Sequence, residues 1–287
     1  MQTIENGERI PYADAQASVT EKLMEQLKLW RGKLTPAPTL SECDEEADRL
    51  FAAQMATRLL ALSLRPAGVQ DIEVIKKLVR PSYCGKNVTG IGLDDFSRMI
   101  VETAAILRGH FVLLSKLHSE YFFMFSRLGT RVEFRKRLAA ELAKRFSSQK
   151  IDSVIAPVTA GGLLVQDVAN ELKADFAFYD VDSYSRACAI RRGYSVHGAT
   201  LIVNDMTTTG GGIKKMMEIP RESGAEIVGV GLIATRGLMG INIVKKLVQD
   251  GYKVETLFHL DIEAVEKNAC ENCRLGLPYI SSADINR

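Results

Sequence analysis

The sequence lacks the features that mark a membrane protein or a disulfide-stabilised secreted protein. No uninterrupted apolar run approaches the roughly 20 residues that a membrane-spanning helix needs. The five cysteines are an odd and scattered set, so we expect reduced thiols in a cytoplasmic protein. The formal net charge of +2 gives no reason to expect a nucleic acid or a membrane as a partner.

Internal repeats and low-complexity tracts are also absent. The 287 residues include 46% hydrophobic and 25% charged residues, which is typical of a globular protein. A chain of this length can bury a substantial core, either as one elaborated domain or as a domain with an extension.

Residues 1–93 are expected to form a helical extension whose role the sequence does not indicate. After a loose arm at 1–14, helical spacing of apolar residues predicts helices at 15–30, 44–63 and 71–79. A loop with prolines covers 31–43, and a loop with glycines covers 82–92. A further helix, 94–108, opens the second part of the chain, residues 94–287.

From residue 118 onward, strands alternate with helices. The expected strands are 118–126, 151–156, 175–180, 199–204, 226–234 and 252–259. The expected helices are 132–146, 163–173, 211–219, 240–250 and 261–268. This alternation predicts an α/β fold, a parallel sheet covered by helices on both faces. Ligands bind at the carboxyl ends of such strands, where we expect four segments: Pro157–Gly162, Tyr179–Arg186, Asn204–Gly212 and Thr235–Gly237.

The segment 199–212 carries the most functional information. An apolar run, Leu201–Val203, predicts a buried strand, and the threonines and glycines of Thr207–Gly212 precede a helix. Backbone N–H groups and the positive helix end in such a turn suit a phosphate monoester, and Asp205 can accept hydrogen bonds from sugar hydroxyls. The loop has neither the Lys-Ser/Thr of a P-loop nor a G-x-G-x-x-G, so an ordinary strand-to-helix turn is the alternative.

Four segments between residues 95 and 280 match the pattern of one family. Gly109–Phe122 matches a hood segment, G-H-F-x-L-x-S-G-x-H-S-x-x-Y, and Ile151–Leu172 matches a pyrophosphate loop with its helix. Arg191–Tyr194 followed by 199–212 matches an R-R-G-[FY] strand and a ribose 5-phosphate loop. In Leu232–Gly237, an arginine follows a strand. Together these segments resemble the type I phosphoribosyltransferases, and within them the orotate phosphoribosyltransferases.

The resemblance implies a type I phosphoribosyltransferase fold for residues 94–287, with a small hood formed by 109–130 and the C-terminal part. It implies transfer of ribose 5-phosphate from phosphoribosyl pyrophosphate to N1 of orotate, giving orotidine 5′-monophosphate and pyrophosphate. It also implies Mg²⁺ as the cofactor and a homodimer.

Roles for individual residues follow from the same resemblance. The residues that would hold the 5-phosphate are Thr207, Thr208, Thr209, Gly210, Gly211 and Gly212. Ala160 and Gly161 would donate backbone N–H groups to pyrophosphate. Asp205, Asn204 and Arg186 would form the catalytic group, and Asp205 would also contact the metal.

On the base side, Arg236 would clamp the orotate carboxylate in a bidentate fork. Phe122 and Phe123 would pack on the flat base with Lys116 beside them, and Lys116 and His118 would supply positive charge near the phosphates. Simpler roles remain open for these residues. Arg236 could be a solvated residue at the start of a helix, and at least one phenylalanine could belong to the core, because the two alternate in a strand. His118 could be a polar residue whose hydrogen bonds are satisfied within the fold. Arg191 and Arg192 would pair with surface acids or face the cleft.

Two departures from the family pattern leave alternatives open. Asn204 stands where the family usually has the first of two adjacent acids, and the loop 180–188 contains only Arg186 as a base. The alternatives are a phosphoribosyltransferase for another base and a non-catalytic regulator that binds phosphoribosyl pyrophosphate or a nucleotide. Residues 1–90 would then signal, or would serve as a docking or oligomerisation module on an active enzyme.

The C-terminal Cys270-x-x-Cys273, followed by Gly276 and Pro278, resembles an element in part of the family. Structural zinc normally has four nitrogen or sulfur ligands. Because no second pair lies nearby in the sequence, we expect a turn with two free thiols rather than a metal site. A redox role is a further alternative, although the motif has no thioredoxin-like context.

Overall fold

A computed structural model describes residues 3–5, 8–10, 21, 24–25, 66–82, 90–158, 161–181, 188–190, 193–281 and 285. The chain divides into two compact units. The first comprises residues 1–67, 108–121 and 264–287, and the second comprises 68–107 and 122–263. Each unit is described by itself below.

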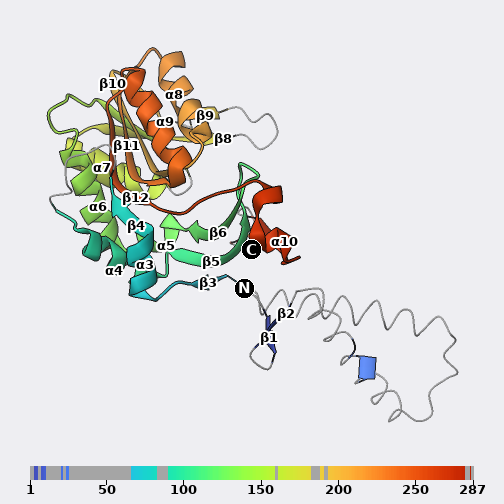
Figure 1. The fold of residues 1–287 in the computed structure, drawn as a ribbon. Helices are drawn as coiled ribbons and strands as arrows, with labels where there is room; N and C mark the ends of the chain where they lie inside the picture. Colours follow the sequence, from blue (N-terminus) through green and yellow to red (C-terminus); the bar gives the residue numbers. More distant parts are fainter. Residues whose placement is uncertain are drawn as a thin grey trace, which may run out of the picture. The chain divides into compact units, whose positions relative to one another are not determined.

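The second unit is built on a seven-stranded sheet in the order β4-β12-β11-β10-β7-β8-β9 (Figure 1). Its strands are β4 (Val79–Pro81), β7 (Ser153–Pro157), β8 (Asp175–Val181), β9 (Cys188–Ile190), β10 (Ala199–Thr207), β11 (Glu226–Arg236) and β12 (Val254–Leu260). The five central strands, from β12 to β8, are parallel, which confirms the predicted parallel sheet. The two edge strands, β4 and β9, run antiparallel to their neighbours, and the sequence pattern did not predict them.

Seven helices belong to the described part of this unit: α3 (Ile72–Leu78), α4 (Leu93–Thr103), α5 (Phe125–Gly129), α6 (Val132–Lys144), α7 (Gly162–Leu172), α8 (Gly211–Glu222) and α9 (Gly237–Gln249). Successive residues of β11 face opposite sides of the sheet, and the helices that they contact lie in two layers. Leu232 joins a buried cluster with Met216 of α8 and Val244 of α9. A side chain at Gly231 would instead point at Leu142 of α6, which packs against α7. Helices therefore cover both faces of the sheet, as predicted (Figure 1).

The helix predicted over 94–108 ends five residues earlier than expected. Ala104 adopts a left-handed conformation, with φ of 49°, and caps the C-terminus of α4. The chain then turns directly into strand β5 (Ile106–Val112), whose start is apolar and buried. The apolar spacing that continued the helical pattern past residue 103 in fact belongs to this strand, so the prediction was wrong there.

The first unit contains β5 from residue 108 onward and most of β6 (His118–Phe123), which pairs with it. The short strand β13 (Ile280–Ser281) runs parallel to β5. Two short helical turns, η1 (Lys267–Ala269) and α10 (Glu271–Arg274), precede β13. The strand β3 (Ala67–Gly68) joins the same sheet.

The helix predicted over 261–268 is absent. Val265 instead exchanges two backbone hydrogen bonds with His118, which fixes the chain in an extended conformation at that point. The N–H and C=O groups of Val265 thus bond to His118 instead of to neighbouring residues in a helix. Short helical turns form only after residue 266.

The predicted loose arm contains a hairpin, because β1 (Thr3–Glu5) pairs antiparallel with β2 (Glu8–Ile10). The helices predicted over 15–30 and 44–63 lie outside the described residues, except for residues 21, 24 and 25, which are helical. Among the described residues, no helix is both long and apolar enough to cross a membrane.

Candidate functional site

The strand order places a topological switch point between β7 and β10. After β7 the chain passes through α7 to β8 on one side, and after β10 it passes through α8 to β11 on the other side. The two helices lie on opposite faces of the sheet. Ligands of open α/β sheets bind outside the carboxyl ends of the strands at such a point. The carboxyl ends of β8, β7, β10 and β11 are neighbours there, as predicted for the four segments.

The loop after β7 closely approaches the end of β10. A Cβ atom on Gly161 would lie 2.7 Å from Cδ of Pro157 and 2.9 Å from Oδ1 of Asn204. A side chain at residue 161 would therefore require Pro157 and Asn204, or the loop itself, to shift. The Asn204 amide donates a hydrogen bond to the carbonyl of Met206, at 3.1 Å. The structure thus brings the predicted pyrophosphate loop and the predicted ribose phosphate loop together.

The loop after β10 presents backbone donors at the start of α8. Gly210 has φ of +76° and lies against Ile243, so a side chain there would be both strained and obstructed. The helical hydrogen bonds begin with Lys214 N–H donating to the Gly210 carbonyl, at 3.0 Å. The N–H groups of Gly211 and Gly212 therefore have no acceptor within the helix, and both glycines are exposed. This is the geometry of an anion site at a helix N-terminus.

The threonines of this loop differ in burial. Thr207 is buried and pairs with Thr235 of the neighbouring strand. Thr208 and Thr209 are half-buried. The loop therefore offers hydroxyl donors beside the exposed backbone of Gly211 and Gly212.

Asp205 is half-buried near the carboxyl end of β10. Removal from water raises the pKa of its carboxyl group to about 6, while the backbone N–H groups of Met206 and Asp205 partly oppose the rise. A nearby cation or a developing positive charge would favour its ionised form. One carboxylate with an adjacent amide oxygen fits Mg²⁺, which typically binds one or two protein carboxylates together with substrate phosphates and water.

Arg236 lies at the junction of β11 and α9, and only 1% of its surface is exposed. Its Nε donates to the carbonyl of Ile262, at 3.4 Å. Burial lowers the pKa of the guanidinium to about 10, and the Glu263 carboxylate opposes the change. The interpretation as a solvated helix-start residue is therefore wrong. Arg236 is a desolvated cation at the carboxyl edge of the sheet.

Phe122 and Phe123 differ in burial, as the alternation of side chains along a strand predicted. Phe123 is 3% exposed, and its ring packs against Phe125 with centroids 6.3 Å apart, so it belongs to the core. Phe122 is half-buried. Lys116 is exposed in the turn between β5 and β6 of the first unit. Arg186, Ala160, Arg191 and Arg192 lie outside the described residues.

No family model matches the chain, but curated relatives do. The orotate phosphoribosyltransferase of Desulforamulus reducens is 30% identical over 189 residues, which cover 65% of this chain and 94% of the relative. That of Caldicellulosiruptor saccharolyticus is 31% identical over 191 residues, again 65% of this chain and 94% of the relative. The chain belongs to the orotate phosphoribosyltransferase family. Among solved structures, the orotate phosphoribosyltransferase of Aeropyrum pernix has a TM-score of 0.48 at 21% identity, covering 55% of this chain and 90% of that chain.

One departure from the family's hood pattern is visible in the backbone. Lys116 stands where that pattern has glycine, and its φ is +69°. The turn is closed by Lys116 N–H donating to the Leu113 carbonyl at 2.9 Å and by Leu113 N–H donating to the Leu117 carbonyl at 2.8 Å. The left-handed conformation explains the family's glycine, because a residue with a Cβ adopts it only at a cost.

Sequence reasoning missed a cluster of four side chains in the first unit. His110 and His118 of the hood lie beside Cys270 and Cys273, with one nitrogen or sulfur atom of each residue within 4.8 Å of the others. Cys270 and Cys273 are free thiols, as expected, but the two histidines, which are distant from them in the sequence, lie beside them and could supply the second pair of ligands. The available signal was His-x₇-His in the hood combined with Cys-x-x-Cys near the C-terminus, two motifs separated by about 150 residues of sequence.

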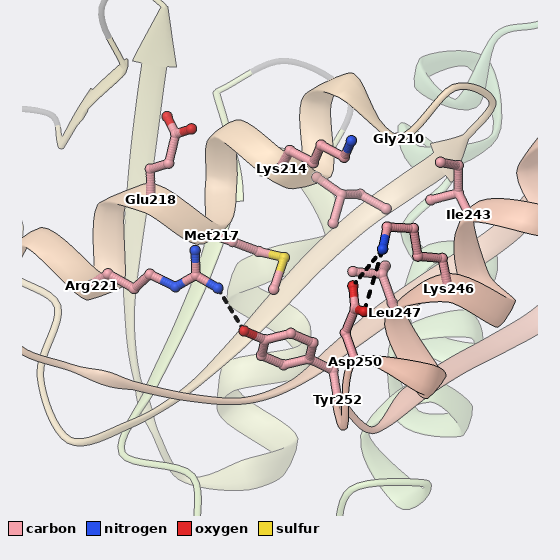
Figure 2. Close-up of a pocket in the computed structure, with 11 residues that line it drawn as sticks. Gly210, Lys214, Met217, Glu218, Arg221, Ile243, Lys246, Leu247, Asp250 and Tyr252 are labelled. Carbon is pink, nitrogen blue, oxygen red and sulfur yellow. Dashed lines mark hydrogen bonds and ion pairs between the residues drawn. The ribbon is translucent and has the colours of Figure 1, made fainter.

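A separate cavity of about 460 Å³ lies between α8 and α9 (Figure 2). Of the residues that line it, only Gly210 belongs to the loop 207–212. An ion pair between Lys246 and Asp250 and a hydrogen bond from Arg221 to Tyr252 cross its wall. Its position on the helical layer, away from the carboxyl ends of the strands, does not suit the substrates of this family.

Proposed function

We propose that the chain transfers ribose 5-phosphate from phosphoribosyl pyrophosphate to N1 of orotate, releasing pyrophosphate. The observation that carries the proposal is the close approach of Gly161 to Asn204 at the switch point, beside the threonine and glycine loop that opens α8. The relatives named above, which carry the name orotate phosphoribosyltransferase, support orotate as the base. They do not favour a different base or a non-catalytic regulator.

The 5-phosphate binds to the backbone donors at the start of α8. The N–H groups of Gly211 and Gly212 and the hydroxyls of Thr208 and Thr209 surround it, and the helix dipole favours its negative charge. Thr207 and Gly210 hold the loop in the required shape. Ala160 and Gly161 donate to the pyrophosphate. Because α8 holds the N–H groups of Gly211 and Gly212 in place before the substrate arrives, these groups position the anomeric carbon with little loss of entropy.

Asp205 acts on the sugar. Its carboxylate accepts hydrogen bonds from the ribose hydroxyls and favours the positive charge that develops at the anomeric carbon as pyrophosphate departs. Asp205 and the Asn204 amide oxygen would hold Mg²⁺, which neutralises charge on the leaving pyrophosphate when bound. Asn204 contributes no charge of its own, so Asp205 supplies the negative charge of this pair. Arg186 completes the catalytic group.

The base lies on the side of Arg236. Its guanidinium has already lost its hydration, so an anionic carboxylate gains a strong partner at little further desolvation cost. Phe122 packs on the flat ring. Phe123 packs in the core and does not contact the base, and Lys116 adds positive charge on the base side.

The remaining parts of the proposal concern the whole chain. Residues 94–287 form the phosphoribosyltransferase domain, and residues 1–93 form an extension of unknown role that contributes the edge strand β4 to the sheet of that domain. The protein acts as a homodimer in the cytoplasm.

A Mg²⁺-dependent assay with phosphoribosyl pyrophosphate and orotate tests the proposal. We expect orotate absorbance to fall in step with pyrophosphate release, and adenine and uracil to give no product. Turnover of a base other than orotate would overturn the base assignment. Binding of phosphoribosyl pyrophosphate without turnover of any base would overturn the enzymatic function.

A further inference from the structure

We propose that His110, His118, Cys270 and Cys273 bind one zinc ion, which fastens the C-terminal segment 264–281 to strands β5 and β6 within the first unit. The site does not take part in the reaction proposed above. It is a structural centre with two nitrogen and two sulfur ligands.

The distances among the four ligand atoms fit a tetrahedral ion. Nε2 of His110 lies 3.4 Å from Sγ of Cys270 and 3.5 Å from Sγ of Cys273. Nδ1 of His118 lies 3.4 Å from Sγ of Cys273 and 3.0 Å from Nε2 of His110. Zinc bonds of about 2.0 Å to nitrogen and about 2.3 Å to sulfur, at tetrahedral angles, place neighbouring ligand atoms about 3.3–3.8 Å apart. Three of the four distances lie in this range, the His110–His118 distance is about 0.3 Å shorter, and all four atoms lie within 4.8 Å of one another, so small side-chain shifts would place them around one zinc ion.

The hydrogen bonding of His110 selects the nitrogen that a metal requires. Its Nδ1 lies 3.0 Å from the carbonyl of Leu277, an acceptor, so Nδ1 carries the proton. The lone pair of Nε2 is then directed at the two cysteines. Metal-binding histidines generally donate their second ring nitrogen in this way, which fixes the orientation of the ring. Leu277 belongs to the same C-terminal segment that the ion would fasten.

The chemistry of the ligands favours zinc over other ions. Two thiolates and two imidazoles in a tetrahedral arrangement are typical of zinc, whereas Mg²⁺ and Ca²⁺ require oxygen ligands. His110, His118 and Cys270 are buried, and Cys273 is partly exposed. Two thiolate charges cancel the charge of Zn²⁺, so a neutral group would occupy this buried place.

The C-terminal segment contributes little apolar surface to the core. Of its described residues, only Cys270 and Leu277 are buried apolar residues. Its regular elements are short: three residues in η1, four in α10 and two in β13. Small structures with a core of this size commonly need a metal or disulfides for stability. A zinc ion would connect residues 110 and 118 to residues 270 and 273 directly.

The experiment measures metal in the full chain, produced with zinc in the medium and purified without a metal-affinity tag. Mass spectrometry of the elements should find one zinc ion per chain. X-ray absorption at the zinc edge should find two sulfur atoms at about 2.3 Å and two nitrogen atoms at about 2.0 Å. The variants His110→Ala and Cys273→Ser should retain less than about a tenth of this zinc, because each removes one of four ligands.

Matched controls use a histidine and a cysteine of the second unit. His197 is exposed and pairs with Asp175, and Cys188 lies in β9. The variants His197→Ala and Cys188→Ser should keep one zinc ion per chain. Loss of zinc from a control, or retention of zinc by both ligand variants, would place the ion elsewhere and overturn the assignment.

A second measurement covers ligand variants that fail to fold. Zinc is removed from the unaltered protein with a chelator under reducing conditions, and proteolysis within 264–281 is followed. We expect cleavage to accelerate at least about tenfold and to be reversed by Zn²⁺ but not by Mg²⁺. Unchanged cleavage would overturn the fastening role. Reduced protein that takes up no zinc, or a Cys270–Cys273 disulfide in the protein as isolated, would overturn the metal site.

Discussion

At the scale of single residues, two glycines set the shape of the site for different reasons. Gly161 leaves no room for a side chain, because Pro157 and Asn204 lie within 3 Å of where its Cβ would be. Gly210 needs its left-handed backbone as well as space beside Ile243. The sequence predicted glycine-rich loops here, but only the structure shows which atom excludes each side chain.

Gly161→Ala should reduce kcat/KM by about 100-fold or more, because the loop must shift away from Asn204 and misplace the pyrophosphate donors. The measurement is steady-state kinetics with both substrates. Gly92→Ala is the matched control, since a Cβ there meets nothing within 4 Å, and it should keep normal kinetics. Normal activity of Gly161→Ala would show that the loop tolerates the displacement.

Asp205 should make the protein less stable as the pH rises. Its folded-state pKa of about 6 lies above the value of about 4 for an unfolded aspartate. Its stabilising contribution is therefore complete below pH 4 and is lost as the pH rises through 6. Asp205→Asn removes the buried charge, so at pH 8 it should be more stable than the natural protein by about 1–3 kcal/mol.

Urea unfolding without substrates, from pH 8 down to pH 4, measures this difference, which should shrink toward zero at the acid end. The substrate-free measurement matters because the substrate phosphate itself titrates near pH 6. The same variant should lose at least about 100-fold in kcat, since it cannot oppose the charge on the sugar. A variant that is less stable at pH 8 would contradict the assigned desolvation of Asp205.

At the scale of elements, the predictions differ from the structure mainly in short edge strands and connecting segments, and not within the long strands and helices. The predicted strands and helices of the sheet region formed close to their expected positions, because an apolar run or an amphipathic repeat specifies them locally. The errors lie where a segment pairs with a strand that is distant in the sequence. β4 is extended because it pairs with β12, and β9 because it pairs with β8. Val265 is extended rather than helical because its backbone pairs with that of His118. Such partners leave no local signal.

The junction of β11 and α9 provides a test of the base pocket. Arg236→Ala should raise the KM for orotate by about 100-fold while sparing the binding of phosphoribosyl pyrophosphate, because the lost interaction is a charge-assisted fork. Calorimetry and kinetics measure the two effects separately. Arg221→Ala, an exposed arginine bonded to Tyr252, is the control and should change neither.

A purely structural Arg236 would give a different result. Its bond to the Ile262 carbonyl would then hold the chain beyond β12, and the variant would unfold more easily and lose both substrates together. Equal loss of both bindings, with reduced stability, would remove Arg236 from the base pocket.

At the scale of the whole molecule, the second unit contains the sheet with the loop 207–212, and the first unit contains the four proposed zinc ligands. Membership in the orotate phosphoribosyltransferase family explains the loops of the second unit. In the first unit, the segments 108–121 and 264–287 come together although about 140 residues separate them. The ligands of one ion therefore come from both ends of the phosphoribosyltransferase region.

The sequence by itself determined the α/β class, the threonine- and glycine-rich loop before α8 and the family, because each depends on residues that are close together in the chain. Apolar periodicity and the run of threonines and glycines after Asp205 are local patterns with local causes. The tertiary structure alone decided that Arg236 is buried and that Gly161 lies against Asn204. It also decided that two histidines complete the pair of cysteines. These are contacts between distant segments, and their geometry depends on strand order and register, which no short stretch of sequence specifies.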